Sequence, residues 1–204
     1  GFHAGFEQYE SLSPTWEKGV VKVSGEEVVA AALKAVDEPG VPRPTYLQLV
    51  FADAHAPRDG FGGDTESSYR AALGQMDDAL ASFEEELKVR GWLPHNTLWV
   101  FVGDHGEGLD SPGHSGPGHG RYLSPSVVSV PWLMAGPGIK AGAHIEGLAS
   151  QVDVAPTILG LLRLNPLEDG GNSWSTLLRE SRGRTTRNAA YTATWFLNTA
   201  RAAV

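Results

Sequence analysis

Apolar residues recur along the chain at two different spacings, and each spacing predicts a different kind of element. In the segment 69–87 an apolar residue returns every third or fourth position, which is the spacing of one buried helix face. The residues on that stripe are Tyr69, Leu73, Met76, Leu80, Phe83 and Leu87. Thr65 or Asp64 can cap the start of this helix, and Gly91 stands where a C-terminal cap is expected.

Two further segments carry helix signals. Ser24 can cap a helix whose first turn holds Glu26 and Glu27, and acidic residues there suit the positive end of the helix dipole. Its apolar positions run to Val36, before the proline-rich stretch 39–44. The segment 154–162 predicts a short helix with Pro156 in its first turn, and 174–179 is a weaker helix candidate.

Four other runs favour strands because they are rich in apolar and β-branched residues. They are 45–51 (TYLQLVF), 97–102 (TLWVFV), 127–135 and 191–197. The first two are too continuously apolar for a sheet with one wet face, and a long helix separates them. This order predicts an α/β fold with a mostly parallel sheet sandwiched by helices.

One strand candidate runs directly into ionisable groups. The stretch TLWVFVGDHGEG passes from apolar residues to Asp104, His105 and Glu107. Ligands of parallel sheets bind at the carboxyl ends of strands, where Asp104 is expected. A carboxylate among apolar strand residues is costly unless a cation compensates it. An aspartate beside an imidazole suits a divalent metal ion.

Composition excludes several classes of function. The chain has 204 residues, 41% of them apolar, so one domain or a large part of one can bury a core. A formal net charge of −8 argues against nucleic-acid binding and against adhesion to anionic lipid. No run approaches the roughly 18 apolar residues of a membrane span. Cysteine is absent, which excludes disulfides, thiolate metal sites and a cysteine nucleophile.

The motifs, taken in order, resemble the sulfatases of the alkaline phosphatase superfamily. The residues that carry the resemblance are GF and QY near Phe6–Tyr9, YLQLVFADAHAPR (46–58), the helix and strand that end in VGDHGE (69–107), HGRYLSPSVVSVPWLMAGPGIKAG (119–142) and SQVDVAPTILGLL (150–162). The resemblance implies an alkaline-phosphatase-like fold, with residues 1–204 forming a single partial catalytic domain. Such proteins are periplasmic, secreted or membrane-anchored.

The resemblance also implies roles for individual residues. Asp104 and His105 match metal ligands, which hold one divalent ion: Ca²⁺ in most sulfatases, and Zn²⁺ or Mn²⁺ in relatives that transfer phosphoryl groups. His55 matches the histidine of a His-x-Pro motif that contacts the sulfate or the leaving-group oxygen. His119 matches a later histidine near the same oxyanion. The implied substrate is a small-molecule or glycan sulfate ester.

The departures from the family pattern are equally specific. No Cys/Ser-x-Pro-x-Arg nucleophile motif is present, because YLSPSVV places Leu123 and Val127 at its key positions. The acidic metal ligands of the family's first strand have no counterpart before residue 45. The chain therefore resembles the C-terminal part of a sulfatase-like catalytic domain without its nucleophile half. Such a fragment alone is expected to be inactive.

Several alternatives stay open at this point. His114 shares the loop of His119, and His105 could serve only as a hydrogen-bonding group. Glu107 suits an anchoring role in its loop better than a catalytic one. The whole protein could instead be a phosphoryl-headgroup transferase or phosphodiesterase of the same superfamily, or a non-catalytic binding protein with a sulfatase-like fold.

Overall fold

The computed structural model describes the chain in two compact units. The first, 1–91, is described at residues 5–10, 12, 23–41, 43–55 and 66–91. The second, 92–204, is described at residues 92–109, 118–120, 123–166, 171–181, 183–184 and 189–190, and for the backbone of 192–196 and 199–203. The single domain expected from the sequence stays a prediction.

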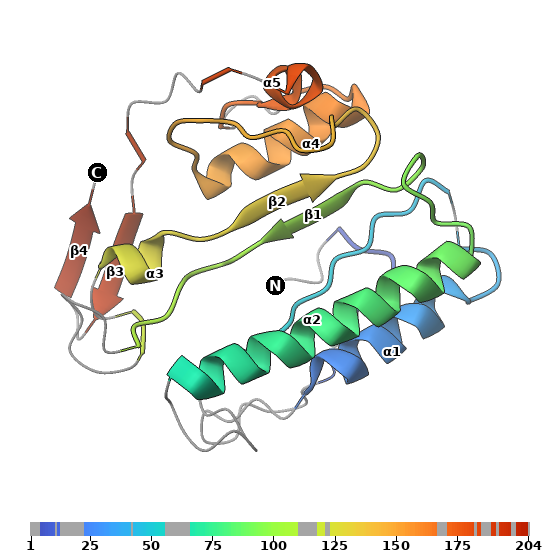
Figure 1. Cartoon of the computed structure of the whole chain (residues 1–204), viewed down its shortest axis with the longest axis horizontal. Helices are drawn as coiled ribbons and strands as arrows, with labels where there is room; N and C mark the ends of the chain where they lie inside the picture. The colour runs from blue at the N-terminus through green and yellow to red at the C-terminus, as the bar shows by residue number, and fades with distance from the viewer. Residues whose placement is uncertain are drawn as a thin grey trace. The chain divides into compact units, whose positions relative to one another are not determined.

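Two helices form the core of the first unit. α1 (Gly25–Val36) and α2 (Glu66–Val89) lie side by side along most of α1 (Figure 1). Ser24 and Glu27 form a reciprocal capping box at the start of α1. The predicted stripe on α2 is confirmed at Phe83 and Leu87, each only 2% exposed, and burying each side chain is worth about 1.5–3 kcal/mol. The predicted caps Asp64 and Thr65 lie outside the described residues.

The segment 45–51 is extended but pairs with no strand among the described residues. After it, the Asp53 carboxylate accepts the backbone N–H of Gly25 at 2.8 Å, at the beginning of α1. A Cβ at Gly25 would stand 3.3 Å from both Asp53 Oδ1 and the ring of Phe51, so the two segments pack closely there. This contact fixes the chain just before His55.

The sheet of the second unit differs from the predicted one. β1 (Trp99–Val102) and β2 (Trp132–Ala135) pair antiparallel, with Trp99 opposite Ala135 and Val102 opposite Trp132. The predicted strand 127–135 is also shorter, because Pro125 starts a single helical turn, α3 (Pro125–Val128), that occupies its beginning. Only the part after Pro131 continues as a strand.

The strand pairs described are thus antiparallel, and the mostly parallel sheet expected from the sequence stays a prediction. β3 (Thr192–Phe196), predicted from 191–197, likewise pairs antiparallel with β4 (Thr199–Ala203). A continuous apolar run indicates that a strand is covered, but strand direction depends on the connection between partners. What the sequence identified correctly is the presence of α and β elements and the strand that ends at Val102.

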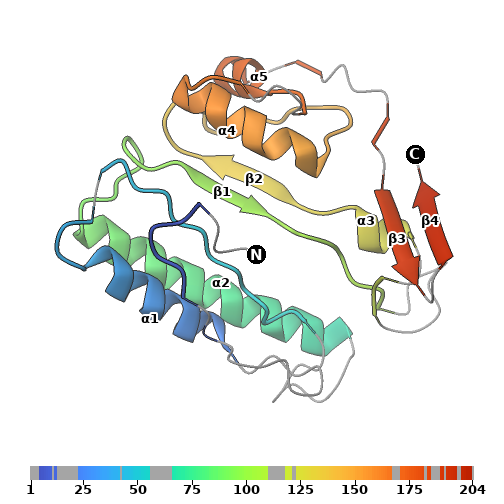
Figure 2. The same ribbon diagram turned by 180° about the vertical axis from the view of Figure 1, so that it is seen from behind.

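A helical layer lies along β2. The single turn η1 (Gln151–Asp153) leads into α4 (Val154–Leu162), which packs against α5 (Ser175–Glu180). In both Figure 1 and Figure 2, α4 and α5 lie on the same side of β2. Trp132 of β2 and Trp174, at the start of α5, place their rings 5.5 Å apart, which joins the strand to this layer.

Several apolar side chains of both units remain exposed, among them Tyr46, Val50, Leu133 and Leu162. Among the described helices, none is both long enough and apolar enough to cross a membrane.

Arg90 connects the C-terminal ends of α1 and α2. Its guanidinium donates from Nε and Nη2 to the two carboxylate oxygens of Asp37, each at 2.8 Å, and from Nη1 to Glu86 Oε2 at 2.6 Å. These hydrogen bonds lower the pKa of Asp37 below its ordinary value of 3.8. A carboxyl group with a lowered pKa stabilises the fold above its ordinary pKa, and that contribution is lost as the pH falls through the folded value.

We therefore expect Arg90→Ala to raise the pKa of Asp37 back toward 3.8 and to lower the free energy of unfolding at pH 7. The loss should shrink as the pH falls below 3.8. Urea unfolding at pH 7 and at pH 2.5, with an NMR titration of Asp37, measures both effects. Arg70→Ala is the matched control, because Arg70 pairs only with Glu66 on the exposed surface of α2 among the described partners. An equal loss at both pH values would exclude the ion pair as the cause.

Candidate functional site

The turn after β1 is held by three backbone contacts. Gly103 N–H donates to Pro131 O at 3.1 Å, which continues the ladder between β1 and β2. Gly106 N–H donates to Val127 O at 2.7 Å, which ties the turn to α3. Gly108 and Gly118 then exchange two hydrogen bonds of 3.0 Å. This last pair closes the loop and returns the chain to the segment 104–107.

Gly106 sits where no side chain fits. A Cβ there would overlap the backbone carbonyl oxygen of Ser126 and would stand 3.3 Å from Val127 Cα. The glycine is therefore required by the close approach of the turn to α3.

Asp104 and His105 lie side by side in this turn. The Asp104 carboxylate accepts the backbone N–H of His105 at 2.8 Å. His105 Nδ1 lies 2.9 Å from the carbonyl oxygen of Gly106, which can only accept, so Nδ1 carries the hydrogen. His105 Nε2 then presents a lone pair 3.7 Å from Asp104 Oδ2.

A second acid–imidazole pair lies next to the first. His119 Nδ1 is 3.5 Å from Glu107 Oε2, and the rings of His105 and His119 lie 3.9 Å apart between centroids, tilted by 33°. The carboxylate of Glu107 therefore places a negative charge beside these two rings. The structure thus brings together three of the predicted site residues, Asp104, His105 and His119.

Burial in the cluster is the reverse of what the sequence suggested. The side chain of Asp104 is 88% exposed, so the expected cost of burying its carboxylate does not arise. The side chain of Glu107 is only 7% exposed, and it contacts His119. This arrangement agrees with an anchoring role for Glu107.

The first pair fits part of a metal site. Histidine ligands commonly donate their second ring nitrogen to a backbone carbonyl, as His105 does to Gly106. Two donors 3.7 Å apart can reach one divalent ion at about 2.0–2.4 Å each. Among the residues that the structure describes, however, no group of three or more acids and histidines could enclose an ion. Asp104 and His105 would supply two ligands of an incomplete shell.

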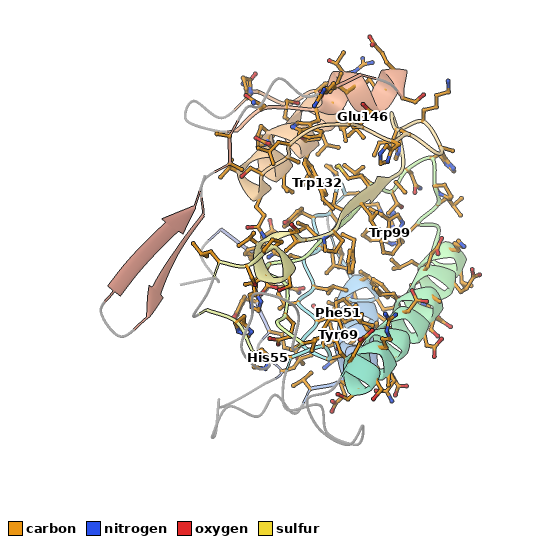
Figure 3. The ribbon with its side chains drawn as sticks, turned by 60° about the vertical axis from the view of Figure 1, so that its left-hand side comes forward. Phe51, His55, Tyr69, Trp99, Trp132 and Glu146 are labelled. Carbon is orange, nitrogen blue, oxygen red and sulfur yellow. The ribbon has the colours of Figure 1, made fainter. Side chains whose placement is uncertain are left out.

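The other two candidate histidines are His55 and His114. His55 belongs to the first unit, where its N–H donates to Ala52 O at 2.9 Å in a turn after the extended segment that contains Phe51 (Figure 3). His114, the alternative to His119, lies outside the described residues, so that choice stays a prediction.

One residue of the site had no separate signal in the sequence. Gln151, in η1, donates its side-chain amide to the carbonyl oxygens of both Gly103 and Asp104, each at 2.7 Å. The motif SQVDVAPT drew attention to this segment only as part of a family pattern. A contact across 47 residues cannot be seen in a local pattern.

Comparison with known proteins identifies relatives over most of the chain. The family model described as sulfatase matches residues 2–164. The chain is 35% identical over 138 residues to the low-salt glycan biosynthesis sulfotransferase Agl7 of Haloferax volcanii, covering 65% of this chain and 32% of that protein. It is 31% identical over 124 residues to an endo-4-O-sulfatase of Bacteroides thetaiotaomicron, covering 59% and 24%.

Solved structures agree with these matches. BT4656 in complex with its substrate D-glucosamine-2-N,6-O-disulfate is 25% identical, with a TM-score of 0.56 over 65% of this chain and 28% of that one. A second, titled a putative sulfatase from Bacteroides thetaiotaomicron, is 25% identical with a TM-score of 0.51. The resemblance inferred from the motifs is confirmed. The chain spans about a third or less of the length of these relatives.

The close contact at Gly106 gives a test of the site's architecture. We expect Gly106→Ala to lower the free energy of unfolding by about 1–3 kcal/mol, because the new methyl group overlaps the Ser126 carbonyl and forces the turn away from α3. Urea unfolding measures this change. Gly74→Ala is the matched control: Gly74 lies within α2, a Cβ there meets nothing within 4 Å, and alanine should stabilise the helix by about 0.5–1 kcal/mol. A neutral Gly106→Ala would contradict the packing described.

Proposed function

Because the chain belongs to the sulfatase family, we propose that it forms part of the catalytic domain of a metal-dependent hydrolase of sulfate esters. The observation that carries the proposal is the pairing of Asp104 with His105, whose Nδ1 is engaged by Gly106 O while Nε2 faces the carboxylate. Asp104 and His105 thus form a metal half-shell, meaning two ligands already oriented for one ion. A second acid–imidazole pair, Glu107 and His119, lies beside them.

Asp104 and His105 would hold the ion. Ca²⁺ is the proposed metal in a sulfatase, and it prefers six or more oxygen ligands, so further ligands must come from residues outside this pair. When bound, the metal supplies positive charge that polarises a sulfate oxygen. Asp104 contributes the negative charge that retains it, and its high exposure leaves room for the ion.

His119 would handle the proton. Glu107 Oε2 lies 3.5 Å from Nδ1 of His119. The other ring nitrogen, Nε2, would therefore donate a proton to the ester oxygen as the S–O bond breaks. The buried carboxylate of Glu107 stabilises the positive charge on the ring before that transfer. His55 would donate to the same oxygen or to the sulfate, as the family pattern implies.

The substrate class proposed is a sulfated sugar or glycan. Its support is similarity of sequence and structure to relatives, since one similar structure holds a disulfated glucosamine substrate and another relative is named an endo-4-O-sulfatase. The mostly parallel sheet belongs to the same proposal. The extended segment 45–51 exposes Tyr46 by 65% and Val50 by 72%, which suits a strand covered by further parts of the catalytic domain.

Asp104→Ala tests the metal site. In the full-length protein we expect this variant to lose Ca²⁺ or Zn²⁺ binding in calorimetry and to lose arylsulfate hydrolysis. Stability should fall by no more than about 0.5–1.5 kcal/mol, because the exposed carboxylate gives up only its hydrogen bond with the N–H of His105. Asp78→Ala, an exposed aspartate on α2, is the control that should leave binding and hydrolysis unchanged. Retained metal binding in Asp104→Ala would remove Asp104 from the site.

A second candidate is transfer of the sulfuryl group to an acceptor hydroxyl instead of water. It is favoured by the relative named a sulfotransferase, which is 35% identical to this chain. In both reactions the S–O ester bond breaks and the leaving alcohol gains a proton. Transfer then gives a new sulfate ester, whereas hydrolysis gives free sulfate.

Product analysis separates the two reactions. The full-length protein is incubated with an arylsulfate, with and without an unsulfated sugar acceptor. We expect inorganic sulfate to match the phenol released in both samples. A sulfated sugar that accounts for the phenol, with little free sulfate, would establish transfer instead.

A further inference from the structure

The carbonyl groups of Gly103 and Asp104 lie where the β1–β2 pairing has ended. The ladder register ends at Val102 opposite Trp132, and only the N–H of Gly103 extends it, to Pro131 O. Backbone carbonyls leaving a strand must find other donors or water. Here a single side chain, Gln151, donates to both at 2.7 Å.

The chemistry of this contact is specific to a primary amide. Both partners are carbonyl oxygens, which only accept, so the atom between them is the amide nitrogen with its two hydrogens. A carboxylate of nearly the same shape would place a negative oxygen against two carbonyl oxygens. Glutamate at position 151 would therefore repel the two carbonyl oxygens that glutamine binds.

Gln151 is itself held in place by a buried anchor. Asp153, fully buried, accepts the backbone N–H of Ser150 at 3.0 Å and that of Asn172 at 2.7 Å. The carbonyl oxygen of Asp153 accepts the hydroxyl of Thr157 at 2.6 Å, and that hydroxyl accepts Trp174 N–H at 3.0 Å. A side chain on such a fixed turn loses little freedom when it binds the Asp104 turn.

We propose that Gln151 is a positioning residue that holds the backbone of Asp104 and His105 in the geometry of the candidate metal half-shell. It would act by restraining the two carbonyls that flank the Asp104 side chain, through the hydrogen bonds of its amide. The link between Gln151 and metal binding rests on the proposed function. The restraint of the Asp104 turn by Gln151 can be measured without metal or substrate.

The first arm of the test uses hydrogen exchange in the metal-free protein. The amides of His105 and Gly106 are hydrogen-bonded to Asp104 Oδ1 and Val127 O, so they report opening of the turn. We expect Gln151→Glu to speed their exchange by about tenfold or more, and Gln151→Leu to have a smaller effect. Val152→Ala is the matched control, since it shortens an exposed side chain of η1 but leaves the hydrogen bonds of Gln151, Asp153 and Thr157 intact.

The second arm measures Ca²⁺ or Zn²⁺ affinity by calorimetry in the full-length protein, with urea unfolding alongside. We expect Gln151→Glu to raise the metal Kd about 10–100-fold, and Val152→Ala to leave Kd unchanged. Unchanged exchange in Gln151→Glu, or equal acceleration in Val152→Ala, would overturn the positioning role. If the wild-type protein binds neither metal, the proposed function fails, yet the exchange comparison still decides whether Gln151 restrains the turn.

Discussion

The reciprocal hydrogen bonds between Gly108 and Gly118 are the constraint on which the candidate site depends. They close a loop of the second unit so that His119 returns to the turn that begins at Asp104. Without this closure, 14 positions would separate His119 from His105 in sequence and nothing would place their rings 3.9 Å apart. The positions of the site's side chains therefore depend first on this pairing of the backbone.

Close backbone packing around the turn supports the same geometry. Gly106 approaches α3 so tightly that only a glycine fits, and Gln151 fixes the carbonyls on the other side of the Asp104 side chain. An exposed ligand such as Asp104 gains precision from such supports, because its own side chain is little restrained by packing. Metal affinity and proton transfer would then depend on residues that touch neither reactant.

Local patterns predicted the helices well and the sheet poorly, for different physical reasons. A capping box and a stripe of apolar residues are contained within one helix, as at Ser24 and Glu27 or at Phe83 and Leu87. Strand direction is set by a partner elsewhere in the chain, and β1 pairs antiparallel with β2 through a connection that includes α3. The helical turn at Pro125 shortened the third predicted strand because proline at a first helical position favours that start.

The sequence by itself determined the family, the long amphipathic helix, and the candidate residues Asp104, His105 and His119, because ordered motifs carry that information along one chain. Only the tertiary structure decided which acid is buried, which nitrogen of His105 faces Asp104, and which side chain restrains their turn. The tautomer of His105 follows from the neighbouring carbonyl of Gly106, whereas burial and restraint depend on groups distant in sequence, such as Val127, His119 and Gln151. Such contacts are made by folding, and no local spacing of residues contains them.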